Sequence, residues 1–116
     1  ILDWELSTLG HPIADFSYHC LSWRSQEAFW DQAKLKELGI PSEKEYMEMY
    51  CENSGKDLSK NWEFYMAFNM FKIAGILQGI LGRVRDGTAA SKHAEERGMM
   101  VYPLSEAAWK IILENF

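Results

Sequence analysis

The sequence predicts a mainly α-helical chain with one short strand end at its N-terminus. Along most of the 116 residues, apolar side chains recur at spacings of three and four, the period of one face of a helix. Only Ile1 and Leu2, which precede two carboxylates, have the character of a strand, and no second strand follows to pair with them. Because a lone strand end cannot satisfy its backbone groups, we expect residues 1–116 to be the helical part of a larger α+β domain.

The first two helices are predicted from their end signals. Pro12 suits a first helical turn, where its missing N–H costs nothing, and Asp15 lies in the same turn, where the helix dipole favours a carboxylate. We therefore expect a helix over residues 13–23. A second helix is expected over about residues 26–38, because Gly39 can end it.

The third helix has the clearest start signal in the chain. Ser42 is followed three residues later by Glu45, which is the pattern of a capping box. We expect this helix to end near Asn53 or Ser54, because Gly55 follows them.

The fourth helix, expected over residues 60–86 with Asp57 or Ser59 as its cap, is the longest and most apolar. Apolar residues lie on nearly all its sides, which is typical of a helix at the centre of a core. Each glycine within it costs about 1 kcal/mol relative to alanine, so we expect another segment to approach closely there. The glycines are Gly75, Gly79 and Gly82, and the aromatic residues expected in the core are Trp62, Phe64, Phe68 and Phe71.

The remaining chain is less apolar until its last helix. Residues 88–100 are small, polar and charged, so we expect a mobile or partly helical connection there. Pro103 and Ser105 then introduce a helix expected over residues 104–115.

Composition excludes several classes of protein. Lys and Arg number 12 against 17 Asp and Glu, and the net charge of −5 argues against a nucleic-acid-binding module and a polybasic membrane surface. The apolar stretches are interrupted by Asn69, Lys72 and Gln78, from which we expect no transmembrane helix. Cys20 and Cys51 make no disulfide scaffold, and both are expected to be structural rather than nucleophilic.

Two acidic residues near the N-terminus are the first candidate site. Asp3 and Glu5 follow the strand end, and in an extended backbone both carboxylates point to the same side. Two oxygen ligands at that spacing suit Mg²⁺, which binds through one or two carboxylates together with phosphates and water. The alternative is that both are solvated loop charges, which the pattern alone favours.

Residues 1–16 carry a family resemblance. Their sequence, Ile-Leu-Asp-Trp-Glu-Leu-Ser-Thr-Leu-Gly-His-Pro-Ile-Ala-Asp-Phe, resembles the segment after the catalytic loop in aminoglycoside phosphotransferase and choline kinase-like enzymes, relatives of the protein kinases. The resemblance implies that Asp3 holds Mg²⁺ on the phosphates of ATP, as the DFG aspartate of kinases does, with Glu5 as a further metal ligand. It also implies that Asp15 braces the catalytic loop; the compatible alternative is that Asp15 only complements the helix dipole.

Three shorter strings narrow the resemblance to one subfamily. Trp-Glu-Leu-Ser-Thr-x-Gly near the N-terminus, Tyr-Met-Ala-Phe in residues 65–68 and Ile-Leu-Gln-Gly in residues 76–79 resemble the kinase-like domain found fused to, or encoded beside, acyl-CoA dehydrogenases. This implies an ATP-dependent small-molecule phosphotransferase that transfers the γ-phosphate to a hydroxyacyl-CoA or a hydroxy acid. It also implies a cytoplasmic location in a bacterium and a mitochondrial or peroxisomal one in a eukaryote.

The resemblance covers only the C-terminal lobe portion of such a fold. The His-x-Asp-x-x-x-x-Asn catalytic loop and the N-terminal lobe of the family do not occur within residues 1–116. We therefore expect Mg²⁺ and ATP to act only in a full-length protein, and these residues alone to be inactive. The alternative is a non-catalytic helical protein-interaction module that binds its partner on an exposed apolar face.

Overall fold

The computed structural model describes residues 7–24, 32–58 and 60–116. Within these ranges the chain forms helices and no strand, which confirms the mainly α-helical prediction; the predicted strand end at Ile1 and Leu2 lies outside them. The helices are α1 (Pro12–Arg24), α2 (Gln32–Glu37), α3 (Glu43–Ser54), α4 (Trp62–Arg85), α5 (Ala94–Met99) and α6 (Val101–Asn115).

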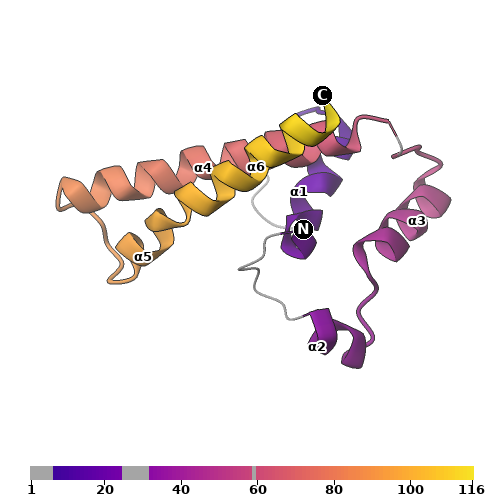
Figure 1. Ribbon diagram of the computed structural model, residues 1–116, viewed down its shortest axis with the longest axis horizontal. Coiled ribbons are helices and arrows are strands. Elements are labelled where there is room, and N and C mark those ends of the chain that lie inside the picture. The colour runs from indigo at the N-terminus through magenta and orange to yellow at the C-terminus, as the bar shows by residue number, and fades with distance from the viewer. Residues whose placement is uncertain (1–6, 25–31, 59) are drawn as a thin grey trace.

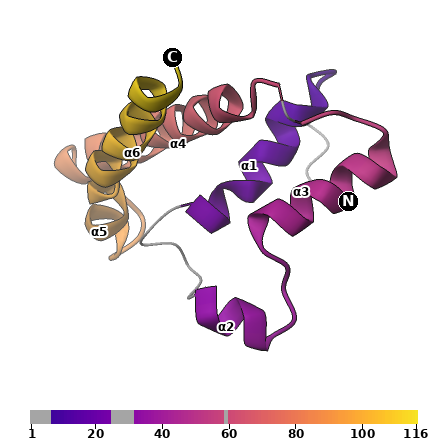
Figure 2. The ribbon, with the colours of Figure 1, turned by 45° about the vertical axis from the view of Figure 1, so that its right-hand side comes forward.

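Helix α4 organises the fold. It runs along the longest dimension of the molecule, and α5 and α6 fold back along it so that α6 is antiparallel to α4 (Figure 1). Helix α1 packs against α4 as well, and in Figure 2 it lies between α4 and α3. Helix α3 therefore meets the rest of the fold mainly through α1.

The core lies where α1 meets α4. Within it, Asn69 of α4 is only 2% exposed and donates from Nδ2 to the carbonyl oxygen of Ala14 and to Oγ of Ser17, both at 2.8 Å. These bonds satisfy the buried amide, which would otherwise destabilise the core. The apolar core residues are Ile13, Cys20, Leu21, Leu58, Trp62, Met66, Met70 and Ala108.

The predicted capping box at the start of α3 is confirmed. The backbone N–H of Glu45 donates to Oγ of Ser42 at 3.3 Å, and the backbone N–H of Ser42 donates to Oε2 of Glu45 at 2.8 Å. The hydrogen bond from the Ser42 hydroxyl lowers the pKa of Glu45. At the other end Gly55 adopts a φ of 66°, so glycine ends the helix as expected.

Other helix boundaries differ from the prediction. The N-cap of α4 is Asn61, with a φ of 64°, rather than Asp57; Ser59 lies outside the described residues. Helix α6 begins at Val101, ahead of the predicted start, because Pro103 is tolerated in a first turn whose N–H groups have no intrahelical partner. The first part of the helix predicted over residues 26–38 also lies outside the described residues.

The connection predicted over residues 88–100 contains a short helix. This helix, α5, packs against α4. Gly98 makes that contact possible, because a Cβ at this position would lie 2.6 Å from the side chain of Leu81.

Within the part of the chain that the structure describes, the expected close approach at the glycines of α4 does not occur. Among the described residues, no other segment lies within 4 Å of a Cβ built on Gly75, Gly79 or Gly82. Three of the four aromatic residues expected in the core are also exposed, whereas Trp62 is buried. The exposed ones are Phe64, Phe68 and Phe71, at 48%, 48% and 75%.

Helix α4 also has the length and the apolar composition of a membrane-spanning helix. In the part of the chain that the structure describes, it is long enough to cross a membrane, and an 18-residue window of it has a mean hydropathy of 1.3. This result corrects the argument that Asn69, Lys72 and Gln78 exclude such a helix. The central helix of a water-soluble fold can have the same length and hydropathy, so these two properties do not by themselves identify a membrane span.

Candidate functional site

Asp15 is the one predicted site residue that the structure describes. It lies in the first turn of α1, where its side chain is exposed, and among the described residues no side-chain partner of its carboxylate is found. A carboxylate there is free to accept hydrogen bonds from a segment outside those residues. Asp3 and Glu5 lie outside the described residues.

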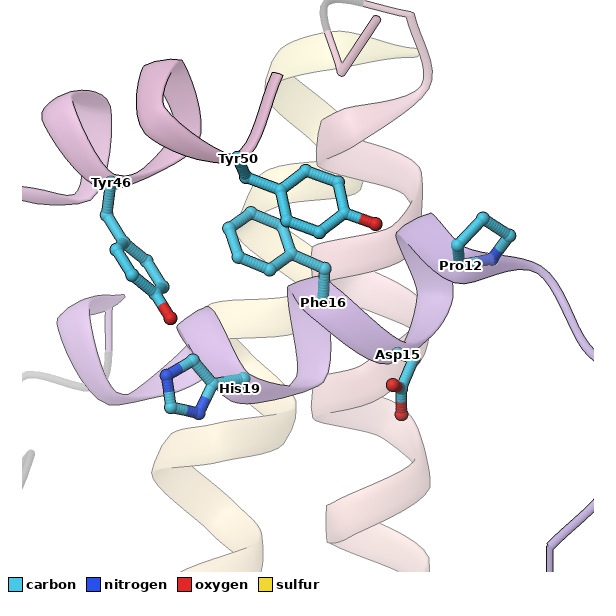
Figure 3. Close-up of a pocket in the computed structure, with 6 residues that line it drawn as sticks. All are labelled: Pro12, Asp15, Phe16, His19, Tyr46 and Tyr50. Carbon is cyan, nitrogen blue, oxygen red and sulfur yellow. The ribbon is translucent and has the colours of Figure 1, made fainter. Parts of the chain in front are cut away.

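Asp15 borders a groove between α1 and α3. The groove has a volume of about 370 Å³. Figure 3 shows that the ring of Tyr46 points toward His19 and that Asp15 lies at the rim, directed away from the rings. The lining residues are Pro12, Asp15, Phe16, His19, Tyr46 and Tyr50.

Aromatic contacts join the two helices beside the groove. The rings of Phe16 and Tyr50 stack with their centroids 3.9 Å apart, and those of Trp23 and Tyr46 stack at 5.2 Å. The indole Nε1 of Trp23 also donates to the carbonyl oxygen of Pro41 at 3.0 Å, just before α3 begins. These side-chain contacts hold α3 against α1, so they set the shape of the groove between the two helices.

An ion-pair cluster around Arg24 also links α1 to α3, and it links α1 to α4. Nε of Arg24 donates to both carboxylate oxygens of Glu43 at 2.9 Å, and its two terminal nitrogens donate to Glu63 at 2.6 and 2.9 Å. The indole N–H of Trp62 also donates to Glu43, at 3.1 Å. One guanidinium therefore connects the end of α1 with the beginnings of α3 and α4. Burial alone would lower the pKa of Arg24, but the hydrogen bonds to Glu63 and Glu43 outweigh it and raise that pKa above its usual value.

Sequence reasoning missed the Arg24 cluster. Its two carboxylates stand 19 and 39 positions away from Arg24 along the chain. No helical or strand period connects residues so far apart, so the cluster had no local signal.

Cys20 is enclosed in the core, as the structural interpretation requires. Its exposure is 0%, and burial together with the charge of Glu43 raises the pKa of its thiol to about 12, although Arg24 opposes the shift. A thiol with that pKa is almost entirely protonated near neutral pH and is a poor nucleophile. Cys51 is half-buried at the edge of the same core.

A Mg²⁺ site can be tested only against the residues described. Across residues 7–24, 32–58 and 60–116, no group of three or more His, Cys, Asp or Glu side chains could hold a metal ion. The proposed ligands Asp3 and Glu5 are outside these ranges, so their fit to Mg²⁺ stays a prediction.

Comparison with known proteins relates this helical chain to a segment of acyl-CoA dehydrogenase family members. It is 43% identical over 114 residues to acyl-CoA dehydrogenase family member 10 of Mus musculus, which covers 94% of this chain and 11% of the mouse protein. It is 35% identical over 120 residues to acyl-CoA dehydrogenase family member 11 of Homo sapiens, covering 100% of this chain and 15% of the human protein. A plant relative, probable acyl-CoA dehydrogenase IBR3 of Arabidopsis thaliana, is 36% identical over 119 residues and is covered to 14% of its length.

The chain thus spans only a small part of the curated relatives it matches, between 11 and 14% for the mouse and plant proteins. No family model matches the chain. No solved structure matches it either. The predicted association with acyl-CoA dehydrogenases is confirmed at the level of these homologues, whereas membership of the phosphotransferase family stays a prediction.

Proposed function

We propose that residues 1–116 form part of an ATP-dependent small-molecule phosphotransferase, which transfers the γ-phosphate of ATP to the hydroxyl group of a hydroxyacyl-CoA or a hydroxy acid. The observation that carries this proposal is the resemblance of residues 1–16 to the kinase-like segment, in which Asp3 and Asp15 would take kinase-like positions. The relationship to acyl-CoA dehydrogenase family members supports it. Such an enzyme would act in the cytoplasm of a bacterium, or in the mitochondria or peroxisomes of a eukaryote.

Asp3 and Glu5 are the residues that would hold the metal. Mg²⁺ supplies charge neutralisation on the phosphates as the phosphoryl group moves. Asp3 contributes a carboxylate at the end of the predicted strand, and Glu5 adds a second one on the same side of an extended backbone.

Asp15 acts as a positioning residue in this proposal. Its exposed carboxylate would accept backbone N–H groups of the catalytic loop. The position supports this role, because the carboxylate lies in the first turn of α1 and no side chain among the described residues bonds to it.

The groove between α1 and α3 is the proposed acceptor wall. It is open to solvent, so an acceptor molecule could reach its lining side chains directly. Phe16 and Tyr50 offer an apolar surface to the carbon chain of a hydroxy acid, and Asp15 borders the same groove.

The proposal is tested with a polypeptide that includes the region preceding Ile1. Transfer of labelled phosphate from Mg-ATP is measured with a panel of hydroxy acids and hydroxyacyl-CoA esters. We expect Asp3→Ala to lower the turnover number by on the order of 100-fold. Asp86→Ala, which removes an exposed carboxylate after α4, is the matched control and should leave turnover unchanged.

Two outcomes would overturn the proposal: transfer to none of the hydroxyl acceptors by the unaltered protein, or full turnover by the Asp3→Ala variant. The isolated residues 1–116 should show no transfer. Activity in that fragment that disappears in Asp3→Ala would contradict the expectation that the missing lobe is required.

A second candidate function is a helical protein-interaction module. The exposed apolar side of α6 favours it. On this reading Asp3→Ala leaves partner binding intact, and a charge placed on α6 abolishes it.

A further inference from the structure

Large apolar side chains are exposed on one side of α6, mainly over its last two turns. Tyr102, Trp109, Leu113 and Phe116 are 60%, 62%, 67% and 74% exposed, and their spacings of seven, four and three place them on one side. We call these four residues the outer face of α6. The opposite side holds Leu104 and Ile111, which pack against the core.

The size of this face is that of a substantial apolar patch on a protein surface. With aromatic side chains of about 150–250 Å² each, exposures of 60–74% leave on the order of 500 Å² of largely apolar surface. That equals the largest patch on a typical monomer, which often has a function. Glu106 lies within the face, between Tyr102 and Trp109, so the continuous apolar part runs from Trp109 to Phe116, with Lys110 and Glu114 to one side of it.

The area also limits which partner can cover the face. Stable complexes between separate proteins bury about 800 Å² on each partner, more than this face offers. Contacts between domains of one polypeptide need only about 600–1,500 Å² in total, because the connecting chain keeps the partners at a high effective concentration. A contact within one polypeptide is therefore favoured over a second copy or a free partner.

The names of the relatives indicate which other part a longer polypeptide would contain. The relatives are named acyl-CoA dehydrogenases, and the matched region covers only 11% of the mouse protein and 15% of the human protein. The outer face of α6 also points away from the core that α1 helps to build, because Leu104 and Ile111 on its opposite side pack against that core. A catalytic loop braced at Asp15 would thus lie on another side, a step that rests on the proposed function.

We propose that the outer face of α6 docks against the acyl-CoA dehydrogenase portion of its own polypeptide. Trp109 lies at the centre of the face, where an aromatic anchor contributes most to an interface. The contact would fix this helical region relative to the dehydrogenase.

Cross-linking of the full-length polypeptide tests this docking. Lys110 follows Trp109 in the sequence and its side chain is 74% exposed, so an amine-reactive cross-linker with a flexible arm can report what lies next to the face. We expect links from Lys110 to the dehydrogenase portion of the same chain, and we expect Leu113→Glu to abolish them. Lys44 on α3, 87% exposed, is the internal control, and its cross-links should not change in that variant.

A matched variant and an isotope mixture separate the other outcomes. Met49→Glu places the same charge at an exposed apolar position of α3 and should leave the Lys110 links intact. Links that join labelled to unlabelled copies would show a dimer and overturn the proposal, as would links only to the region before Ile1.

Hydroxyl-radical footprinting of Trp109 supplies a readout that needs no cross-link. In the full-length protein we expect slow oxidation of Trp109, which becomes several-fold faster in Leu113→Glu. Equal rates in the two proteins would show an uncovered face and would overturn the proposal. Neither readout depends on catalysis, so this proposal and the phosphotransferase proposal can fail separately.

Discussion

Replacing Arg24 with Met removes the cation on which three helices converge. The change keeps an apolar side chain of similar length but leaves Glu43 and Glu63 without their shared partner. Each hydrogen bond to a charged group contributes about 1.5–3 kcal/mol, and breaking a fully buried pair costs about 3–5 kcal/mol. Because these side chains retain 20–30% exposure, water can replace part of the interaction, and we expect a loss of about 2–3 kcal/mol.

Equilibrium urea unfolding, followed by tryptophan fluorescence, measures this loss. Arg24→Met should lower the urea midpoint, whereas Lys44→Met, which breaks the exposed pair with Glu48, should change stability by at most about 0.5 kcal/mol. In the double variant with Glu63→Gln the loss should be smaller than the sum of the two single losses, because both changes break the same contact. Equal midpoints for Arg24→Met and Lys44→Met would refute the reasoning.

Three further predictions concern packing, reactivity and pH. Gly98→Ala should destabilise the protein by about 1–3 kcal/mol in urea unfolding, because its Cβ would lie 2.6 Å from the side chain of Leu81. Cys20, with its pKa raised to about 12, should resist a thiol-reactive dye until the protein unfolds. The folded-state pKa of Glu45 lies below its unfolded value, so the capping box stabilises α3 above the unfolded pKa and loses this effect as the pH falls through the folded pKa. Thermal melts across acidic pH should therefore fall less steeply for Ser42→Ala than for the unaltered protein.

Each of these predictions has a control within the chain. Gly79→Ala adds a methyl group in open space on a helix and should stabilise the protein by up to about 1 kcal/mol; a loss there would contradict the packing argument. Half-buried Cys51 should react with the dye before Cys20, and the reverse order would contradict the burial argument. Identical acid profiles with and without Ser42 would show that the capping box does not carry the pH dependence.

The helices were predictable because their signals are local. The capping box of Ser42 and Glu45, and Gly55 after the helix, fixed the bounds of α3 within a few neighbouring residues. Periodicity likewise located α1 and α4. It could not say which side of α4 would be covered, because a helix that is apolar all round has no marked inner face. For that reason the sequence predicts Phe71 and Gly75 on a packed surface, whereas the structure exposes both.

The candidate site residues also differ in whether their signals are local in the sequence. The position of Asp15 in a first helical turn could be predicted, because adjacent residues signal the start of that helix. The structure places Asp15 at the rim of a groove. Arg24 was missed because its partners come from two other helices. The groove could not be predicted from the sequence either, because its two walls come together only when α1 and α3 pack.

The shape of the groove depends on a few side-chain contacts between α1 and α3. Helix α3 has no fully buried residue of its own, and it meets α1 through ring stacking and through Glu43 on Arg24. Stacked aromatic pairs contribute only about 0.5–1.5 kcal/mol each beyond their buried area, so the ion pair is a large share of what holds this helix in place. Losing Arg24 should therefore free α3, and with it one wall of the groove, before it disturbs the packing of α4 against α6. A site that borders Asp15 would then owe its shape to a residue at the opposite end of α1.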